Sequence, residues 1–148
     1  MELVTWGEFA QHAPELATFG AERLRAAPAY LASVRRSGEP RVHPVTPILT
    51  ADGLYLFMEP TSPKGRDLRE RGWFALHNGV PDTSGTGGEF FVRGRGAVVE
   101  AAAVRTSVAE AASYDPEPRY ILFELRLVEA RGNSYGDVAL PEPSHWKA

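Results

Sequence analysis

Cysteine is absent from this chain of 148 residues. Without a thiol the protein has no disulfide, no thiolate nucleophile and no zinc site with cysteine ligands. The absence is compatible with a reducing compartment, because disulfides persist mainly in oxidising ones.

Long apolar runs are missing as well. No stretch approaches the roughly 20 apolar residues that a membrane-spanning helix needs. The first residues, MELVTWGEFAQ, lack the basic and then apolar order of a secretory signal. We therefore expect a soluble, cytoplasmic protein with no membrane partner.

Strong charge and the common catalytic motifs are also missing. The net charge is −3, from 16 basic and 19 acidic residues, so we expect no nucleic-acid partner. The chain has no GxSxG nucleophile elbow, no HExxH zinc motif and no GxGxxG between a strand and a helix. Its histidines are scattered at positions 12, 43, 77 and 145, so no metal site is predicted. No residue is assigned a catalytic role.

The sequence does contain an ordinary share of apolar residues, 43%, which indicates a folded core. The length is typical of one domain, and such a domain buries roughly 68–70% of its unfolded surface. Because there are no repeats, low-complexity blocks or linkers, we predict a single domain over residues 1–148.

Helix signals dominate residues 5–25. Thr5 can cap a first helix, with Glu8 as its capping-box partner. Pro14 breaks that helix and can begin a second one that continues to about residue 25. A third, alanine-rich helix is predicted over residues 101–114.

Strand signals follow from about residue 29, where apolar residues alternate with polar ones. Gly94 and Gly96 suggest a bend or a close backbone approach within one strand, and the glycine-rich loop 79–88 is a candidate mobile flap. Because strands outnumber helices and run as hairpins, we predict a mainly β (α+β) fold, an antiparallel barrel with peripheral helices. The predicted strands cover residues 29–35, 41–50, 54–59, 73–78, 89–100 and 119–130.

Residues 41–71 organise the rest of the chain. Two strands, 41–50 and 54–59, flank a hairpin turn at 51–53. Pro44 and Pro47 each remove a ladder donor, so the first strand should be irregular or at an edge, with backbone left free for a ligand.

A short basic helix follows this hairpin. Ser62 suits its N-cap, Pro63 its first position and Gly72 its end. Free backbone N–H groups, the hydroxyls of Thr61 and Ser62 and the ammonium of Lys64 would then gather at its N-terminus. Such a helix end binds anions and suits phosphate. The alternative interpretation is a capped surface helix with solvated charges.

The order of these elements, with the turn SGEP, the strand with HPV and the segment SPKGRDL, resembles the pyridoxamine 5′-phosphate oxidase-like, flavin-binding split barrels. In that family a Ser-x-Lys-x-x-Asn/Asp-Leu segment holds the phosphate, and Ser62, Lys64, Asp67 and Leu68 match it. Pro63 stands where the family often has an arginine of the cationic clamp. The resemblance covers roughly residues 29–100.

The resemblance implies an antiparallel split barrel, a homodimer with the site at the subunit boundary, and FMN or a deazaflavin coenzyme as cofactor. It suggests a small flavin-dependent oxidoreductase of unknown substrate, in which the cofactor supplies the electron chemistry. The alternatives are a flavin- or haem-binding carrier with the same fold and no turnover, and a partner-binding domain whose anion site is accidental. The expected cofactor-binding residues are Arg41, His43, Pro44, Val45, Thr46, Met58, Glu59, Thr61, Ser62, Lys64 and His77.

Several side chains have two interpretations. His77 is either a hydrogen-bonded structural histidine or part of the cofactor cleft. Arg93 and Arg95 are either a solvated pair or a second phosphate or carboxylate contact. Trp146, beside His145, could also reach a cofactor.

Overall fold

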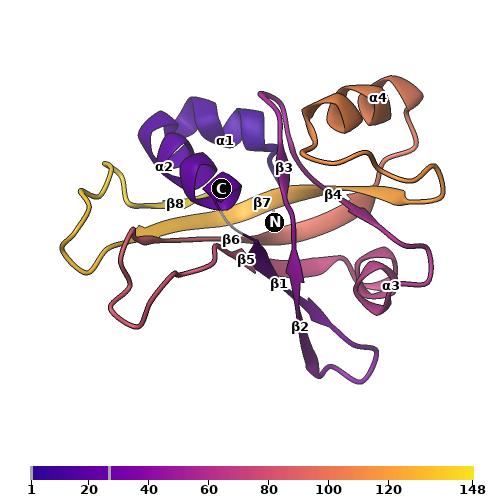
Figure 1. The fold of residues 1–148 in the computed structure, drawn as a ribbon, viewed down its shortest axis with the longest axis horizontal. Helices are drawn as coiled ribbons and strands as arrows, with labels where there is room; N and C mark the ends of the chain where they lie inside the picture. The colour runs from indigo at the N-terminus through magenta and orange to yellow at the C-terminus, as the bar shows by residue number, and fades with distance from the viewer. Residues whose placement is uncertain (1, 27) are drawn as a thin grey trace.

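The computed structural model describes residues 2–26 and 28–148, which form four helices and eight strands (Figure 1). The helices are α1 (Trp6–His12), α2 (Pro14–Ala26), α3 (Pro63–Glu70) and α4 (Ala102–Ala111). The strands are β1 (Ala29–Val34), β2 (Pro40–Val45), β3 (Ile48–Leu49), β4 (Leu54–Met58), β5 (Trp73–His77), β6 (Glu89–Val98), β7 (Ile121–Asn133) and β8 (His145–Lys147).

All eight strands belong to one antiparallel sheet, in the order β2-β1-β5-β6-β7-β4-β3, with β8 paired to β7. Strands β2 and β3 lie at opposite ends of this order, yet only Thr46 and Pro47 separate them in the chain. The sheet must therefore curl so that its two ends approach each other. The predicted antiparallel split barrel with peripheral helices is confirmed.

The main hydrophobic core lies against the inner face of the sheet. Helices α1 and α2 pack together against β6 and β7 (Figure 1), and three phenylalanines, Phe9, Phe90 and Phe123, are completely buried between these layers. Helix α4 covers part of the outer face, where Val108 packs with residues of β3, β4 and β7. Helix α3 packs against β1, β5 and β6, and its Asp67 contacts Ser33 of β1.

The ends of α1 and α3 occur where their local signals predict, whereas α4, expected over residues 101–114, ends at Ala111. The Thr5 hydroxyl accepts a hydrogen bond from the Glu8 N–H at 3.1 Å, and the Glu8 carboxylate accepts one from the Thr5 N–H at 2.7 Å, which completes the capping box. Ser62 caps α3, and Gly72 follows its end with a positive φ of 84°, a conformation that glycine adopts readily.

Three details refine the predicted strands. The strand expected over 41–50 is interrupted at Thr46 and Pro47, where the chain leaves one sheet edge for the other. Strand β8 was not predicted. Gly94 lies beside a bulge, and a Cβ there would collide with the Arg126 carbonyl oxygen, so the close backbone approach is confirmed.

No helix within the described residues is long and apolar enough to cross a membrane.

Candidate functional site

The first turn of α3 holds the predicted anion-binding groups together. The buried Ser62 hydroxyl accepts a hydrogen bond from the Gly65 N–H at 3.4 Å and one from the Lys64 ammonium at 3.1 Å. Lys64 is half-buried, and this burial lowers the pKa of its ammonium from the ordinary value. Within residues 2–26 and 28–148, the Lys64 N–H has no hydrogen-bond partner. A cation, a free N–H and the exposed Thr61 therefore meet at one helix end.

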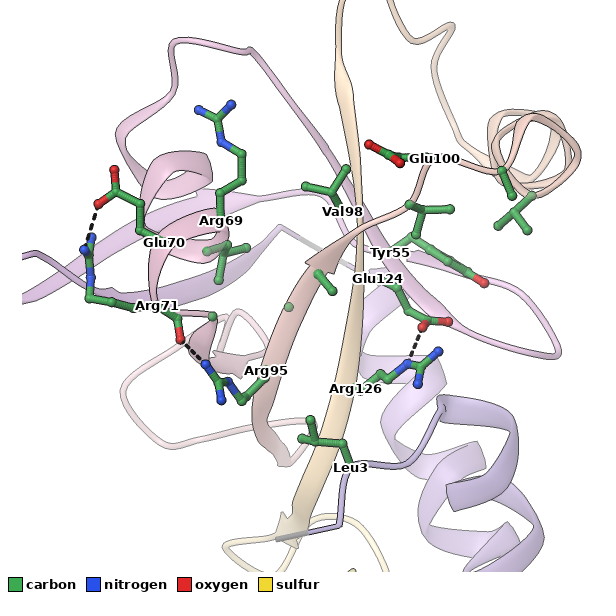
Figure 2. A pocket seen from close by; sticks show the side chains of 17 residues that line it. Leu3, Tyr55, Arg69, Glu70, Arg71, Arg95, Val98, Glu100, Glu124 and Arg126 are labelled. Atoms are coloured by element: carbon green, nitrogen blue, oxygen red, sulfur yellow. Dashed lines mark hydrogen bonds and ion pairs between the residues drawn. The ribbon is translucent and has the colours of Figure 1, made fainter.

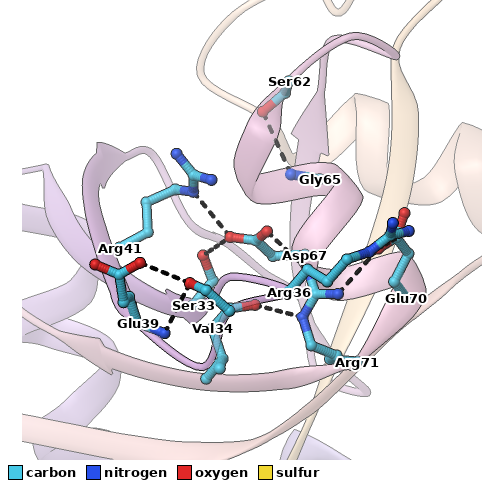
Figure 3. A network of polar contacts seen from close by, with 11 residues as sticks. Ser33, Val34, Arg36, Glu39, Arg41, Ser62, Gly65, Asp67, Glu70 and Arg71 are labelled. Carbon is cyan, nitrogen blue, oxygen red and sulfur yellow. Dashed lines mark hydrogen bonds and ion pairs between the residues drawn. The ribbon is translucent and has the colours of Figure 1, made fainter.

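The second half of α3 is anchored by Asp67, which is 3% exposed (Figure 3). Its carboxylate accepts hydrogen bonds from the Ser33 hydroxyl at 2.7 Å, Arg41 Nε at 2.8 Å and an Arg71 terminal nitrogen at 3.0 Å. Burial alone would raise the pKa of Asp67, but the hydrogen bonds from Arg41 and Ser33 and the charge of Arg41 outweigh it and hold that pKa below its ordinary value. This network ties α3 to the β1–β2 hairpin.

Arg41, predicted to bind the cofactor, is thus committed through Nε to Asp67 (Figure 3). Its two terminal nitrogens point away from that carboxylate in the figure. Asp67, which matches the family segment, is in turn enclosed by protein groups. The pair joins β2 to the helix that carries Lys64, so Arg41 has a structural role whether or not it also contacts a ligand.

Strand β2 presents its residues to two faces of the sheet. Arg41, His43 and Val45 oppose Ser33, Leu31 and Ala29 of β1, which identifies the inner face. Pro44 opposes Tyr30 on the outer face. His43, Pro44 and Thr46 are exposed, whereas Val45 is buried. The predicted edge strand with accessible backbone is therefore present beside α3.

The end of β4 leads directly into α3. Met58 is buried, and its sulfur packs near Gly65 in the first helical turn. Glu59 accepts a hydrogen bond from Arg119 Nε at 2.9 Å, and this bond lowers the pKa of Glu59. Met58 is thus a support of the turn, and Glu59 already has a cationic partner.

His77 lies apart from these groups, on the outer face of β5. It opposes Tyr30 of β1 and Phe91 of β6, whereas the Asp67 network reaches the inner-face residues Ser33 and Arg41. His77 and Phe91 line a cavity of about 540 Å³ together with Arg131 and His145. In one copy of the chain, the structure therefore gathers Arg41, Ser62 and Lys64 around α3 and places His77 across the sheet.

Arg93, Arg95 and Trp146, for which the sequence left a structural and a cofactor-binding role open, each contact other residues of the protein. Arg93 forms an ion pair with Glu129 at 2.7 Å. Arg95 donates to the Arg71 carbonyl oxygen at 2.6 Å and lies over the Trp73 ring. Trp146 packs against Phe9 with ring centroids 5.0 Å apart, and it lies partly buried against the core beneath α1.

A cavity of about 920 Å³ was not predicted from the sequence (Figure 2). It lies between the C-terminal end of α3, the outer side of β6 and β7, and α4. Figure 2 shows that its polar side chains are largely paired with one another, as in the contacts of Arg126 with Glu124 and of Arg71 with Glu70. No local sequence signal marks it, because its walls come from distant segments.

No protein-family model and no curated protein matches the sequence. Among solved structures, the chain is similar to a haem-binding protein from Mycobacterium smegmatis, with 20% identity, a TM-score of 0.67 and coverage of 82% of this chain and 54% of that one. HutZ, the haem storage protein from Vibrio cholerae, has 16% identity, a TM-score of 0.59 and coverage of 77% and 88%.

General Stress Protein 26 from Bacillus anthracis has 13% identity, a TM-score of 0.64 and coverage of 88% and 97%. The chain spans about half the length of the mycobacterial protein. At these identities the likeness establishes the fold alone. The chain therefore has the same fold as these structures, an antiparallel split barrel.

Proposed function

We propose that this protein binds a planar cofactor with an acidic arm, either haem or a flavin phosphate, and that the first turn of α3 binds the acidic group. The observation that carries the proposal is the Lys64 ammonium, held 3.1 Å from the Ser62 hydroxyl in a partly buried position at a helix N-terminus. A partly desolvated cation interacts more strongly with an anion than a fully solvated one. The donor set suits a propionate or a phosphate equally.

Haem is the cofactor that the structural comparisons favour, since two of the similar structures are described as haem-binding and haem storage proteins. A protein that only carries haem needs no acid–base pair and no nucleophile, which agrees with the absence of catalytic motifs. Bound haem would supply redox chemistry at iron. The chain's residues would bind the acidic arms and exclude water.

A flavin phosphate, FMN or a deazaflavin coenzyme, is the second candidate and is favoured by the chemistry of the helix end. A helix N-terminus with a lysine and a hydroxyl is a common phosphate site. Bound flavin would supply electron or hydride transfer, and the protein would then be a small oxidoreductase. Lys64 and Thr61 would bind the phosphate, and the exposed backbone of β2 would lie beside the ring.

We also propose a homodimer formed through the outer face of β2, β1 and β5. Three large apolar side chains are exposed on this face: Val42 at 68%, Tyr30 at 49% and Trp73 at 38%. Strand β2 is a sheet edge, and a second copy would cover both the edge and the apolar patch. Light scattering should give a mass of about twice 16.2 kDa; the mass of one chain would refute the dimer.

Ligand titration tests the cofactor proposal. Hemin, FMN and riboflavin are titrated against the wild type, Lys64→Ala and the control Lys147→Ala, which removes the other lysine of the chain. A charged hydrogen bond contributes roughly 1.5–3 kcal/mol, so Lys64→Ala should weaken FMN binding by about one to two powers of ten. Riboflavin, which lacks the phosphate, should bind both proteins equally.

The same titration separates the two cofactors. Tight binding of hemin without FMN identifies a haem protein, and the reverse identifies a flavoprotein. Equal losses for FMN and riboflavin in Lys64→Ala would defeat the phosphate assignment. A wild type that binds none of the three ligands would defeat the proposed function.

A further inference from the structure

The loop of residues 79–88, which joins β5 to β6, is held together at its two ends by one side chain. Asn78 is 4% exposed, and its amide nitrogen donates to the carbonyl oxygens of Gly79 at 3.2 Å and Gly88 at 3.3 Å. The amide oxygen accepts a hydrogen bond from the Phe90 N–H at 2.7 Å. Asn78 therefore ties the first residue of the loop to the last one.

Helix α2 holds the same loop through Arg23. The Nε of Arg23 donates to the Gly87 carbonyl oxygen at 2.7 Å, and its Nη1 donates to the Phe19 carbonyl oxygen at 2.9 Å. The guanidinium also lies over the Phe19 ring, 3.5 Å from the centroid, and the side chain is 14% exposed. Within residues 2–26 and 28–148, Nη2 has no hydrogen-bond partner. Arg23 is therefore fixed in orientation and keeps one donor group available.

The loop, the end of α2 and the start of β1 enclose a cavity of about 420 Å³. Glycine backbone and apolar side chains form most of its walls, and the apolar side chains are those of Ala26, Pro28, Tyr30, Val80 and Pro81. Four of these five are exposed, with Tyr30 at 49%. Exposed apolar surface around a concavity of roughly 300–1,000 Å³ is typical of a small-molecule site. Since a cavity of about 150 Å³ already binds benzene, this one has room for one or two rings.

The charge of the walls narrows the class of ligand. Arg23 is the only charged side chain among the described residues that line the cavity. Glu22 lies 3.6 Å from Nη1, but its side chain is 69% exposed, so water screens this pair. A guanidinium binds carboxylates well, and the flat ring of Tyr30 offers a surface for an aromatic ring. The walls therefore favour an aromatic ring with a negative charge over one with a positive charge.

We propose that this cavity binds a small aromatic carboxylate of one or two rings, with the ring against the apolar walls and the carboxylate on Arg23. The site is separate from the first turn of α3. Tyr30 stands near the start of β1, whereas Ser33, which contacts Asp67 of α3, stands near its end. The inference therefore goes beyond the proposed cofactor site and does not depend on it.

The test is a calorimetric titration of the full chain with three probes of similar shape: naphthoate, the neutral naphthamide and the cationic naphthylmethylamine. Because a charged hydrogen bond is about twice as strong as a neutral one, naphthoate should bind roughly tenfold more tightly than naphthamide. The amine should bind more weakly than both. Amide chemical-shift changes on addition of naphthoate, measured by NMR, should centre on residues 79–88.

Two variants locate the ligand. Arg23→Met keeps an unbranched apolar side chain without the charge, so naphthoate should fall to the affinity of naphthamide, whereas naphthamide should bind as it does to the wild type. Arg25→Met, which removes the next arginine of α2, is the control and should match the wild type. Val80→Trp fills the cavity and should abolish binding of all three probes. Tyr30 stays unchanged in these variants, because its ring also belongs to the proposed dimer face.

Each contrary result has a definite meaning. Equal affinities of the three probes for the wild type, or equal losses of naphthoate and naphthamide in Arg23→Met, would overturn the assignment of a carboxylate ligand. A wild type that binds none of the probes would overturn the site. Binding that persists in a folded Val80→Trp would do the same, and so would wild-type chemical-shift changes centred outside residues 79–88. FMN and hemin titrations of Arg23→Met should match the wild type, so failure here leaves the Lys64 assignment standing.

Discussion

The two ends of helix α3 differ in whether their charged side chain is neutralised by an oppositely charged partner. At the C-terminal half, the Asp67 carboxylate is buried and fully engaged by Ser33, Arg41 and Arg71. At the first turn, the Lys64 ammonium is partly buried, and its hydrogen-bond partner among the described residues is the neutral Ser62 hydroxyl. A charge with matched partners stabilises the fold, whereas a desolvated charge without a counter-ion is ready to bind one. The same short helix therefore carries an anchor at one end and a candidate binding site at the other.

The largest expected effect comes from removing the anchor. Breaking a buried ion pair by deleting one partner costs about 3–5 kcal/mol. The side chains of Arg41 and Arg71 are 25% and 23% exposed and can turn to water, so we expect Asp67→Ala to lose about 3 kcal/mol, at the lower end of that range. Urea unfolding followed by circular dichroism measures the loss. Glu70→Ala removes an exposed partner of the same Arg71 and should change the midpoint little.

Protonation of Asp67 in acid should weaken the same network without a mutation. Because the folded-state pKa of Asp67 lies below its unfolded value, its contribution to stability is complete above the unfolded pKa of about 3.9. The contribution is lost as the pH falls through the folded pKa. Wild type should therefore lose stability between neutral pH and acid more steeply than Asp67→Asn. Parallel pH profiles for the two proteins would show that Asp67 is not the anchor we describe.

Gly65 tests how open the first turn is. A Cβ at this position would lie 3.5 Å from the Met58 sulfur, an ordinary contact. Replacing a helical glycine with alanine removes backbone entropy from the unfolded chain, so Gly65→Ala should add roughly 0.5–1 kcal/mol. The denaturant midpoint would reveal this gain. If FMN or hemin affinity falls in the same variant, then the ligand approaches the turn closely at Gly65.

The smallest expected effect on stability is that of the candidate binding residue. Because burial already disfavours its charge, Lys64→Met should change the free energy of unfolding by less than about 0.5 kcal/mol, as most surface substitutions do. The same variant should lose anion affinity as Lys64→Ala does. A large loss of stability in Lys64→Met would instead identify Lys64 as part of the structural framework.

Local signals predicted the fold of this chain well. The capping box of Thr5 and Glu8, the N-cap at Ser62 and the glycine at the end of α3 each act within a few residues. Apolar alternation predicted most strands, and the antiparallel barrel followed from their number and spacing. These features need no knowledge of distant contacts, because backbone capping and side-chain periodicity are decided within one helical turn or one hairpin.

The candidate site was predicted less completely. Ser62 and Lys64 do lie together, and the roles of the eleven proposed cofactor residues stay predictions. The partner of Arg41 could not be foreseen, because the Ser33–Asp67 and Arg41–Asp67 contacts join segments 34 and 26 residues apart. His77 faces away from α3 because strand register, which depends on pairing with β1 and β6, decides its face.

Sequence alone determined where helices α1 and α3 of this protein begin and end, most of the segments that form strands, and that a cation and a hydroxyl stand at the first turn of α3. The tertiary structure decided which charges are neutralised and which stay available, since pairing depends on side chains brought together by the curl of the sheet. It also placed His77 in a cavity whose walls come from β5, β6, β7 and β8. Local propensity acts over a few residues, whereas burial and ion pairing arise only when the barrel closes.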